Sequence, residues 1–461
     1  MSPARICILR CASTARRSIR SRAISRSTAS KGKATVFCMR SKKYSLSAVI
    51  TLLILVVALA ISITMMIAMR YFNQQVNAVT QKQALYAHIT DIDTKVRTYY
   101  PTLDEEQLRS ALAAGYVAGL QDPYARYYST DAYKQALLLR EGRAAGVGIR
   151  LKTDAQSRLV VVDTLDADAA AEKAGVQVGD IVTQVNGNAV AGPQQASLQE
   201  MLDTSTEKLA VSVLRGDKAI AFELTAYTYN LKSVQEKMLN ETVGYIRITA
   251  FYDNTLNQFK AACSSLENQG AASYIFDVRG CSGGGSTDTL KAMLSYLLPH
   301  GAYAAWVGSD GRTENLVADD ARTLSGTFAV VTDEKTKGEA ELFAGVLQEF
   351  GVATVVGEKT AGKGKIQDFV ALKADNSAIY LTVGEIVLMR GGSIEGVGIT
   401  PTVAVSLPAA QKAQGAALKT EDDAQVQAAL NTFKASTNQL NATAATTAAA
   451  RTAATTAAAA E

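Results

Sequence analysis

Histidine is scarce in this chain: its 461 residues include two, His88 and His300. A Ser-His-Asp triad needs a histidine as its base, and catalytic zinc sites draw heavily on histidine ligands. His88 lies in a stretch of helical spacing, and His300 stands in a Pro-His-Gly turn far along the chain. The sequence therefore argues against a histidine-based hydrolase and a histidine-rich metal site. We expect no metal and no other cofactor.

Cysteine and proline are also scarce, with 5 and 7 residues respectively. Cys7, Cys11 and Cys38 lie near the N-terminus, which leaves Cys263 and Cys281 for the rest of the chain. A disulfide-dense scaffold is therefore excluded, and whether Cys263 pairs with Cys281 stays open. A hydrophobic content of 48% with 33 glycines suits a mixed α/β protein of two or three domains.

Acidic residues are missing from residues 1–43, which carry 12 Lys and Arg. The other 35 basic residues face all 43 acidic ones, so the remainder has a net charge of −8 and is not a nucleic-acid-binding body. The basic segment resembles a transit peptide in composition. We favour the alternative that Met39 is the true start.

A run without charged residues follows at residues 44–69, rich in Leu, Ile, Val, Ala and Met. At about 1.5 Å per residue, a helix of this length exceeds a hydrocarbon core of roughly 30 Å. A buried core helix or a signal peptide are the alternatives, but the run is longer than a signal's apolar region. We expect a transmembrane helix. Arg40, Lys42 and Lys43 before it place the N-terminus in the cytoplasm and the main body outside the cell membrane.

Residues 70–140 are expected to be helical, with an interruption at Tyr99-Tyr100-Pro101, because the residue before a proline avoids the α conformation. Residues 141–228 follow with Gly146-Val147-Gly148-Ile149, alternating strands, a helix ending at Gly175 and a turn at Asn186-Gly187. This series resembles a PDZ domain. The resemblance implies that Gly146, Val147, Gly148 and Ile149 bind a peptide's terminal carboxylate while the next strand pairs with the peptide.

From Val243 strands alternate with helices, as in α/β folds. A strand over residues 273–279 runs into the glycine-rich turn 280–285, and helices are expected at 254–266, 287–298 and 422–430. The turn has neither dinucleotide-binding nor P-loop spacing. It can expose backbone N–H groups to a developing oxyanion, and it also suits a tight strand-to-helix connection.

The stretch 331–367 contains a Gly-Lys-Gly turn at residues 362–364. Together with Asp122-Pro123-Tyr124, the glycine turn and the stretch 391–401, it resembles the carboxy-terminal-processing peptidases, or tail-specific proteases. The likeness covers about residues 80–432. It implies an α+β chain whose ClpP/crotonase-like α/β peptidase core spans residues 229–408, followed by a helix and an Ala/Thr-rich disordered tail in 409–461.

The resemblance also implies site roles. Lys363 takes the place of the catalytic base, and Gln367 that of the residue that orients it. Gly283, Gly284 and the amide of Glu339 take the places of the oxyanion donors. The position of the nucleophilic serine falls on Gly338, which has no side chain to attack a carbonyl.

The neighbours of Gly338 depart from the family as well. The family's small residues are replaced over residues 335–340, Thr402 stands where an aspartate is usual, and the Glu339 carboxylate opposes a developing oxyanion. We therefore predict a pseudopeptidase that binds unfolded polypeptides or protein C-termini, or regulates a partner, with no nucleic-acid partner and with homo-oligomerisation left open. The alternative is an active serine-type endopeptidase whose nucleophile has moved to Thr336, Ser282, Ser286 or Cys281.

Overall fold

The computed structural model describes residues 45–100, 102–190, 192–205, 207–318, 324–412, 414 and 418–434. The predictions for the basic N-terminal segment, its three cysteines, the start at Met39 and the Ala/Thr-rich tail lie outside these residues. The chain divides into two units, Met1–Leu103 and Asp104–Glu461.

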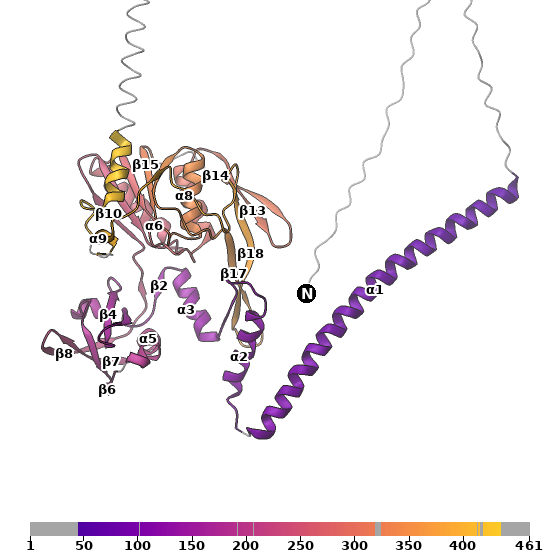
Figure 1. The fold of residues 1–461 in the computed structure, drawn as a ribbon, viewed down its shortest axis with the longest axis horizontal. Coiled ribbons are helices and arrows are strands. Elements are labelled where there is room, and N and C mark those ends of the chain that lie inside the picture. The colour runs from indigo at the N-terminus through magenta and orange to yellow at the C-terminus, as the bar shows by residue number, and fades with distance from the viewer. Residues whose placement is uncertain are drawn as a thin grey trace, which may run out of the picture. The chain divides into compact units, whose positions relative to one another are not determined.

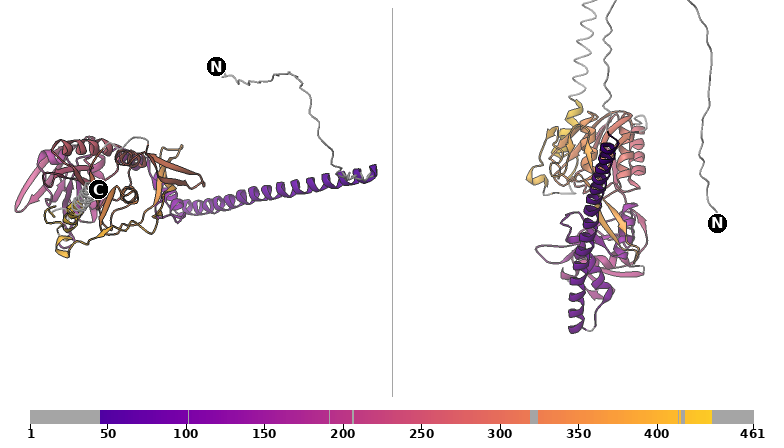
Figure 2. Two further views of the ribbon diagram at one scale, coloured as in Figure 1. Left: turned by 90° about the horizontal axis from the view of Figure 1, so that it is seen from above. Right: turned by 90° about the vertical axis from the view of Figure 1, so that its right-hand side faces the viewer.

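The first unit is described by one long helix, α1 (Leu46–Tyr99), which is unbroken in every view (Figures 1 and 2). It contains no glycine or proline, and Pro101 follows its end, which explains both its length and its termination. The segment Ile50–Asn73 is long and apolar enough to cross a membrane, and its side chains make no packed core. A helix was predicted here, and a helix is found.

The second unit begins with α2 (Glu105–Ala118), β1 (Arg126–Tyr128) and α3 (Thr130–Arg140). The Asp104 carboxylate caps α2 by accepting from the N–H groups of Glu106 and Gln107, as N-cap aspartates do. Ser129 caps α3 in the same way through the N–H of Ala132. Strand β1 pairs with β18 (Ala378–Leu388), so this N-terminal part is built into a sheet that is completed by much later sequence.

An antiparallel sheet with the order β3-β4-β5-β7-β8 follows. Its members are β3 (Ile149–Thr153), β4 (Val160–Leu165), β5 (Ile181–Val185), β7 (Lys208–Arg215) and β8 (Lys218–Thr225). The shorter elements are β2 (Arg143–Ala144), α4 (Ala170–Ala174), β6 (Asn188–Ala189), the 3-10 turn η1 (Gly192–Gln194), α5 (Gln195–Thr204) and β9 (Tyr229–Asn230). The left-handed Gly175 ends α4, and positive φ angles at Asn186 and Gly187 make the β5–β6 turn. Both features were predicted from turn chemistry.

A mostly parallel sheet has the order β10-β11-β12-β15-β16-β20. Its strands are β10 (Val234–Met238), β11 (Val243–Ile248), β12 (Ser273–Asp277), β15 (Thr327–Thr332), β16 (Ala353–Gly357) and β20 (Val403–Ala404). All neighbours are parallel except β10 and β11. The connecting helices are α6 (Thr255–Asn268), α7 (Thr287–Leu297) and α8 (Glu339–Glu349), and α9 (Ala409–Lys412) follows β20.

Both faces of this sheet are buried, as parallel sheets require. On one face Ile246, Phe276 and Val330 join a core with residues of the three connecting helices. On the other, Tyr245, Ile275 and Val331 pack with Val426 and Phe433 of the helix formed by residues 424–434. A helix predicted over 422–430 therefore closes the second face.

A further sheet is built around β18, with β1, β13 (Gly301–Gly308), β14 (Thr313–Ala318), β17 (Lys365–Ala371) and β19 (Gly392–Ser393) as its other members. Figure 1 shows β17 and β18 beside each other, reaching away from the mostly parallel sheet. The mostly parallel sheet positions the site, because three loops leave the carboxyl ends of its neighbouring strands β12, β15 and β16. These loops carry the glycine turn, Gly338 and Lys363 respectively. Carboxyl ends of parallel strands are a common place for ligand sites in α/β folds.

Candidate functional site

Gly338 stands directly before α8 in a backbone conformation that side chains seldom adopt, with φ 60° and ψ −122°. A Cβ atom built on it would meet nothing closer than the Gly283 Cα at 3.6 Å and the Lys363 Cδ at 3.9 Å. The fold thus brings together three positions that are far apart in sequence. There is room for a side chain at Gly338, and it would point to the stem of Lys363.

Glu341 links the Gly338 loop to the Lys363 loop through hydrogen bonds. Its fully buried carboxylate accepts from the backbone N–H groups of Gly338 at 3.1 Å, Gly362 at 2.6 Å and Lys363 at 2.7 Å. It also accepts from the Thr360 hydroxyl. A carboxylate with this many donors can stay buried, since each of its lone pairs has a partner. Sequence reasoning did not assign Glu341 a role.

Lys363 is half-buried, and its Nζ lies 5.2 Å from the centre of the Tyr124 ring, within cation–π range. The Tyr124 hydroxyl donates to Glu395 Oε1 at 3.0 Å, while Glu395 Oε2 accepts from the N–H of Gly364 at 2.8 Å. Burial, together with the neighbouring Glu395, raises the pKa of Tyr124 to about 12. Tyr124 belongs to the Asp-Pro-Tyr segment that the sequence singled out without giving it a function, and here it supports the lysine.

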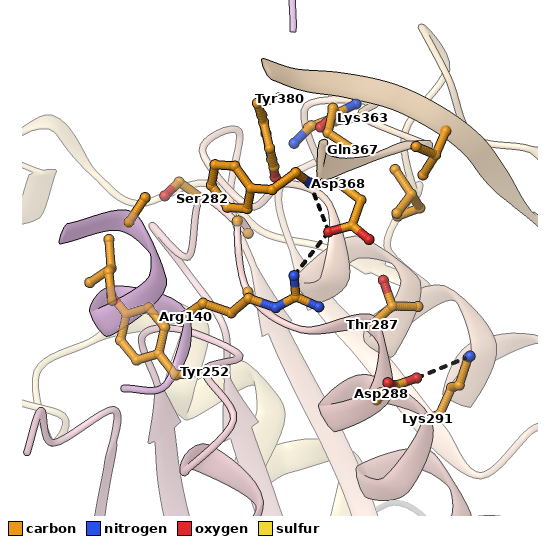
Figure 3. Close-up of a pocket in the computed structure, with 18 of the residues that line it drawn as sticks. Arg140, Tyr252, Ser282, Thr287, Asp288, Lys291, Lys363, Gln367, Asp368 and Tyr380 are labelled. Carbon is orange, nitrogen blue, oxygen red and sulfur yellow. Dashed lines mark hydrogen bonds and ion pairs between the residues drawn. The ribbon is translucent and has the colours of Figure 1, made fainter. Parts of the chain in front are cut away.

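Gln367 lies on β17, in the same pocket as Lys363 (Figure 3). Its side-chain amide donates to the Lys365 carbonyl at 3.1 Å and to the Thr382 hydroxyl at 3.4 Å. Its amide therefore donates to β17 and β18. Its predicted role of orienting Lys363 stays a prediction.

The glycine turn faces α8, and the side chain of Glu339 fills the space between them. Glu339 Oε2 accepts from the backbone N–H of Gly284 at 3.0 Å, and it would lie 2.6 Å from a Cβ atom on Gly283. Gly283 and Gly284 both have positive φ angles, 67° and 79°. The close approach of the carboxylate is possible because these positions are glycine. The N–H group expected to stabilise an oxyanion is therefore already bonded to a negative oxygen.

A buried charge cluster anchors the glycine turn at its start. The Asp277 carboxylate is fully buried and pairs with Arg279 at 2.6 Å and Arg247 at 3.1 Å, and Arg279 reaches Asp423 at 2.8 Å. Burial acts to raise the pKa of Asp277, but hydrogen bonding and charge from Arg279 and Arg247 outweigh it and hold the pKa below its usual value. The cluster joins the turn to the C-terminal helix at residues 424–434.

The alternative nucleophiles are engaged or buried, apart from Ser282. The Thr336 hydroxyl is fully buried and bonds Asp333 and the Val278 carbonyl, so it serves its own loop. Cys281 is buried, which raises the pKa of its thiol to about 12, and Ser286 caps α7. Ser282 is exposed and lines the pocket shown in Figure 3, but it belongs to the glycine turn rather than to the start of α8.

The pocket beside Lys363 has a volume of about 590 Å³, within the usual range for ligand sites. Its walls are aromatic in part, with Tyr128, Tyr252, Trp306, Phe369 and Tyr380. Figure 3 shows Arg140 of α3 and Asp368 of β17 pointing to each other across it, with an ion-pair distance of 2.9 Å. No group of three His, Cys, Asp or Glu side chains within the described ranges could hold a metal.

Gly146, Val147, Gly148 and Ile149 form the loop before β3 and its first residue, and all four are buried. Gly146 and Gly148 have φ angles of 109° and 77°, which explains why glycine recurs there. The N–H of Val147 donates to the Leu202 carbonyl at the end of α5, at 3.2 Å. Their role in binding a carboxylate stays a prediction.

The structure thus has an α/β core in which Lys363, Gly338 and the glycine turn meet, preceded by a small antiparallel domain, as predicted for a peptidase-like core and a PDZ domain. Comparison with known families agrees. Residues 242–405 match the profile of "Peptidase family S41", and residues 136–214 match that of the "PDZ domain". The chain thus carries a peptidase family S41 domain and a PDZ domain.

Its relatives bear the names of processing proteases. The chain is 27% identical to a carboxy-terminal-processing protease of Bartonella bacilliformis over 346 residues, covering 71% of this chain and 77% of the relative. It is 28% identical to a probable CtpA-like serine protease of Staphylococcus epidermidis over 369 residues, covering 77% and 73%. It is 27% identical to the carboxy-terminal processing protease CtpA of Bacillus subtilis over 325 residues, covering 67% and 66%. The protein is therefore similar to the C-terminal processing proteases and carries a PDZ domain.

Proposed function

We propose that this protein is a membrane-anchored pseudopeptidase that holds polypeptide chains instead of cutting them. The single observation that carries the proposal is the pair formed by Gly338 and Glu339. Gly338 offers no nucleophile, and the Glu339 carboxylate already accepts the hydrogen bond of the Gly284 N–H. Acyl transfer needs both a nucleophile and a free hydrogen-bond donor, and in this proposal the site lacks both.

In this proposal the remaining site residues are a retained frame. Lys363 stands in the place of the base and Gln367 in that of its orienting residue, while Gly283, Gly284 and the Glu339 amide stand in the places of the oxyanion donors. Glu341 and Tyr124 support the frame through hydrogen bonds and the ring contact with Lys363. A retained frame suits a cleft that still accepts a polypeptide, because the contacts that hold substrate are separate from the reacting atoms.

We further propose that residues 44–69 anchor the chain in the cell membrane with the N-terminus inside. The segment Ile50–Asn73 has the length and composition for this, and Arg40, Lys42 and Lys43 precede it. The parts that then lie outside the membrane are the helical region 70–140, the PDZ domain 141–228, the peptidase-like core 229–408 and the segment 409–461.

The proposed ligands are unfolded polypeptides or protein C-termini, bound by the PDZ domain. PDZ domains bind extended peptides by adding them to a sheet edge, and a loop of backbone N–H groups receives the terminal carboxylate. Gly146, Val147, Gly148 and Ile149 are the proposed loop, and β3 is the proposed edge. A protein that binds such chains without cleaving them can compete with an active peptidase for its substrates or regulate a partner.

The test uses the full chain purified in detergent. We expect no cleavage of reduced, unfolded casein and no labelling by a fluorophosphonate probe. Lys363→Ala is the informative variant, and Lys359→Ala, at an exposed position in the same loop, is its matched control. Turnover that Lys363→Ala abolishes and Lys359→Ala leaves intact would overturn the proposal.

A further inference from the structure

The edge of the PDZ sheet that a peptide would join is already occupied by side chains of α5. Strand β3 lies at the end of its sheet, and β4 is its one paired neighbour in the described part of the chain. On its other side Gln199 Oε1 accepts from the N–H of Leu151 at 2.9 Å, and Gln199 Nε2 donates to the carbonyl of Ile149 at 2.9 Å. Gln195 Nε2 donates to the carbonyl of Leu151 at 2.8 Å.

These bonds repeat the pattern that an added strand would make. A glutamine side chain ends in an amide with a carbonyl acceptor and N–H donors, the same groups that a peptide unit offers. Strand addition satisfies an edge through alternating N–H and carbonyl partners of this kind. Gln195 and Gln199 therefore stand in for the backbone of a bound peptide.

The loop proposed to receive the peptide's terminal carboxylate is also in contact with α5. The N–H of Val147 donates to the carbonyl of Leu202 in the last turn of α5. A Cβ atom on Gly146 would lie 2.3 Å from the same Leu202 oxygen, so loop and helix are in tight contact. Since Leu198 and Leu202 are buried in the domain core, α5 is held in this place by packing.

Charged side chains fix the position of the Gln199 amide. Gln199 Nε2 also donates to Asp203 Oδ1 at 3.0 Å, and Asp203 pairs with Arg150 of β3 at 3.0 Å. Arg150 lies 3.5 Å from Asp166 as well. Helix α5 and strand β3 are thus joined by an ion pair next to the two glutamines.

We propose that Gln195 and Gln199 keep the edge of β3 closed and act as a built-in competitor for extended polypeptide. This inference rests on the proposed peptide-binding function of the PDZ domain. A polypeptide can pair with β3 only when it displaces both amides, so the wild-type domain binds polypeptide weakly. It strengthens when the amides are removed or turned away.

The test compares the full chain in detergent with a Gln195→Ala/Gln199→Ala variant. The control is Gln194→Ala, which removes an exposed glutamine just before α5. The probe is a fluorescein-labelled pool of ten-residue peptides of randomised sequence with free terminal carboxylates, and an amidated pool serves beside it. We expect the double variant to bind the free-carboxylate pool at least about tenfold more tightly than the wild type, because it loses three competing hydrogen bonds and the loss of about one already implies such a change. The control should bind like the wild type.

A second measurement needs no peptide. Hydrogen exchange at the Leu151 N–H reports the bond to Gln199 directly, and it should speed up in the double variant, which removes the Gln199 Oε1 acceptor. Unchanged Leu151 exchange, or equal peptide affinity in wild type and double variant, would overturn the inference while leaving peptide binding intact. Faster exchange with no peptide bound by any protein would support the closure and overturn the peptide-binding function instead.

Discussion

The carboxylate of Glu339 accepts a hydrogen bond from the backbone N–H of Gly284, with 3.0 Å between the oxygen and the nitrogen. Glu339 is buried and begins α8, so its negative charge lies at the positive end of the helix dipole and is stabilised there. The side chain holds an oxygen where the turn could otherwise hold the oxygen of a substrate. In the proposed function, the absence of a side chain at Gly338 and the presence of this carboxylate both oppose acyl transfer.

Introducing a serine at position 338 alone should not create a reactive site. We expect Gly338→Ser to remain unlabelled by a fluorophosphonate probe, and Gly338→Ser/Glu339→Ala to be labelled, because only the second frees the Gly284 N–H. Serine at φ 60° and ψ −122° is strained, so Gly338→Ser should also lower the free energy of unfolding by about 1–3 kcal/mol.

Glu339→Ala by itself is the control for this comparison, and it should stay unlabelled. If Gly338→Ser alone were labelled as strongly as Gly338→Ser/Glu339→Ala, the carboxylate would not obstruct the site.

Replacing Glu341 should destabilise the core far more than replacing Glu339. Glu341→Ala leaves three buried N–H groups and a hydroxyl without their acceptor. A buried unsatisfied donor costs about 1–3 kcal/mol, so we expect a loss of at least about 3 kcal/mol in urea unfolding. Glu339→Ala removes one such bond and should cost about 1–2 kcal/mol. Similar losses for the two variants would contradict the central role of Glu341.

Asp277 should make the stability of the core depend on acid pH. Its pKa is held below the usual value, so its contribution is complete above the unfolded pKa of about 4 and is lost as the pH falls through the folded pKa. Asp277→Asn breaks a buried pair and should lower stability at pH 7 by about 3–5 kcal/mol. The difference between wild type and variant should shrink in unfolding experiments as the pH falls below about 4. A difference that stays constant from about pH 4 down to about pH 2 would rule out this role.

The strands and helices of the core were predictable because periodic apolar residues and glycine turns specify them locally. The strand Val243–Ile248 and the helices near Thr255 and Thr287 were found within a few residues of their predicted bounds. The pairing of β1 with β18 was not predictable, since no local pattern joins residues so far apart.

The candidate site was predictable only in its parts. Motifs pointed to Gly338 and Lys363, and the structure brings the two together. Other contacts depend on the directions of side chains in three dimensions. They are the hydrogen bond between Glu339 and Gly284, the hydrogen bonds to Glu341 and the contact of the Tyr124 ring with Lys363. Gln195 and Gln199 carry no sequence signal at all, because a glutamine pair at this spacing is ordinary on an exposed helix.

Cys263 and Cys281 should resist alkylation in the folded protein. Both are free and buried, and burial raises the pKa of each thiol to about 12, which leaves almost no thiolate at pH 8. We expect iodoacetamide to modify both only after unfolding, as measured by peptide mass spectrometry. A disulfide between them in the native protein, or fast labelling without denaturant, would contradict the structure.

The apolar part of α1 should hold the chain in membranes. The wild type should remain in the membrane fraction after a carbonate wash. Ile61→Arg/Ile63→Arg should be released, because each arginine near the middle of a spanning helix costs roughly 2.5–3.5 kcal/mol. Tyr86→Arg lies on the same helix outside Ile50–Asn73 and is the matched control. Release of the wild type itself would remove the anchor from the proposal.

The helix at residues 424–434 covers the second face of the mostly parallel sheet and brings Asp423 to Arg279 beside the glycine turn. These residues follow every strand of that sheet in the sequence, so the second face stays uncovered until they have left the ribosome. Until then the apolar side chains of Tyr245, Ile275 and Val331 are accessible to chaperones and proteases. Folding of the core is therefore coupled to the synthesis of this helix.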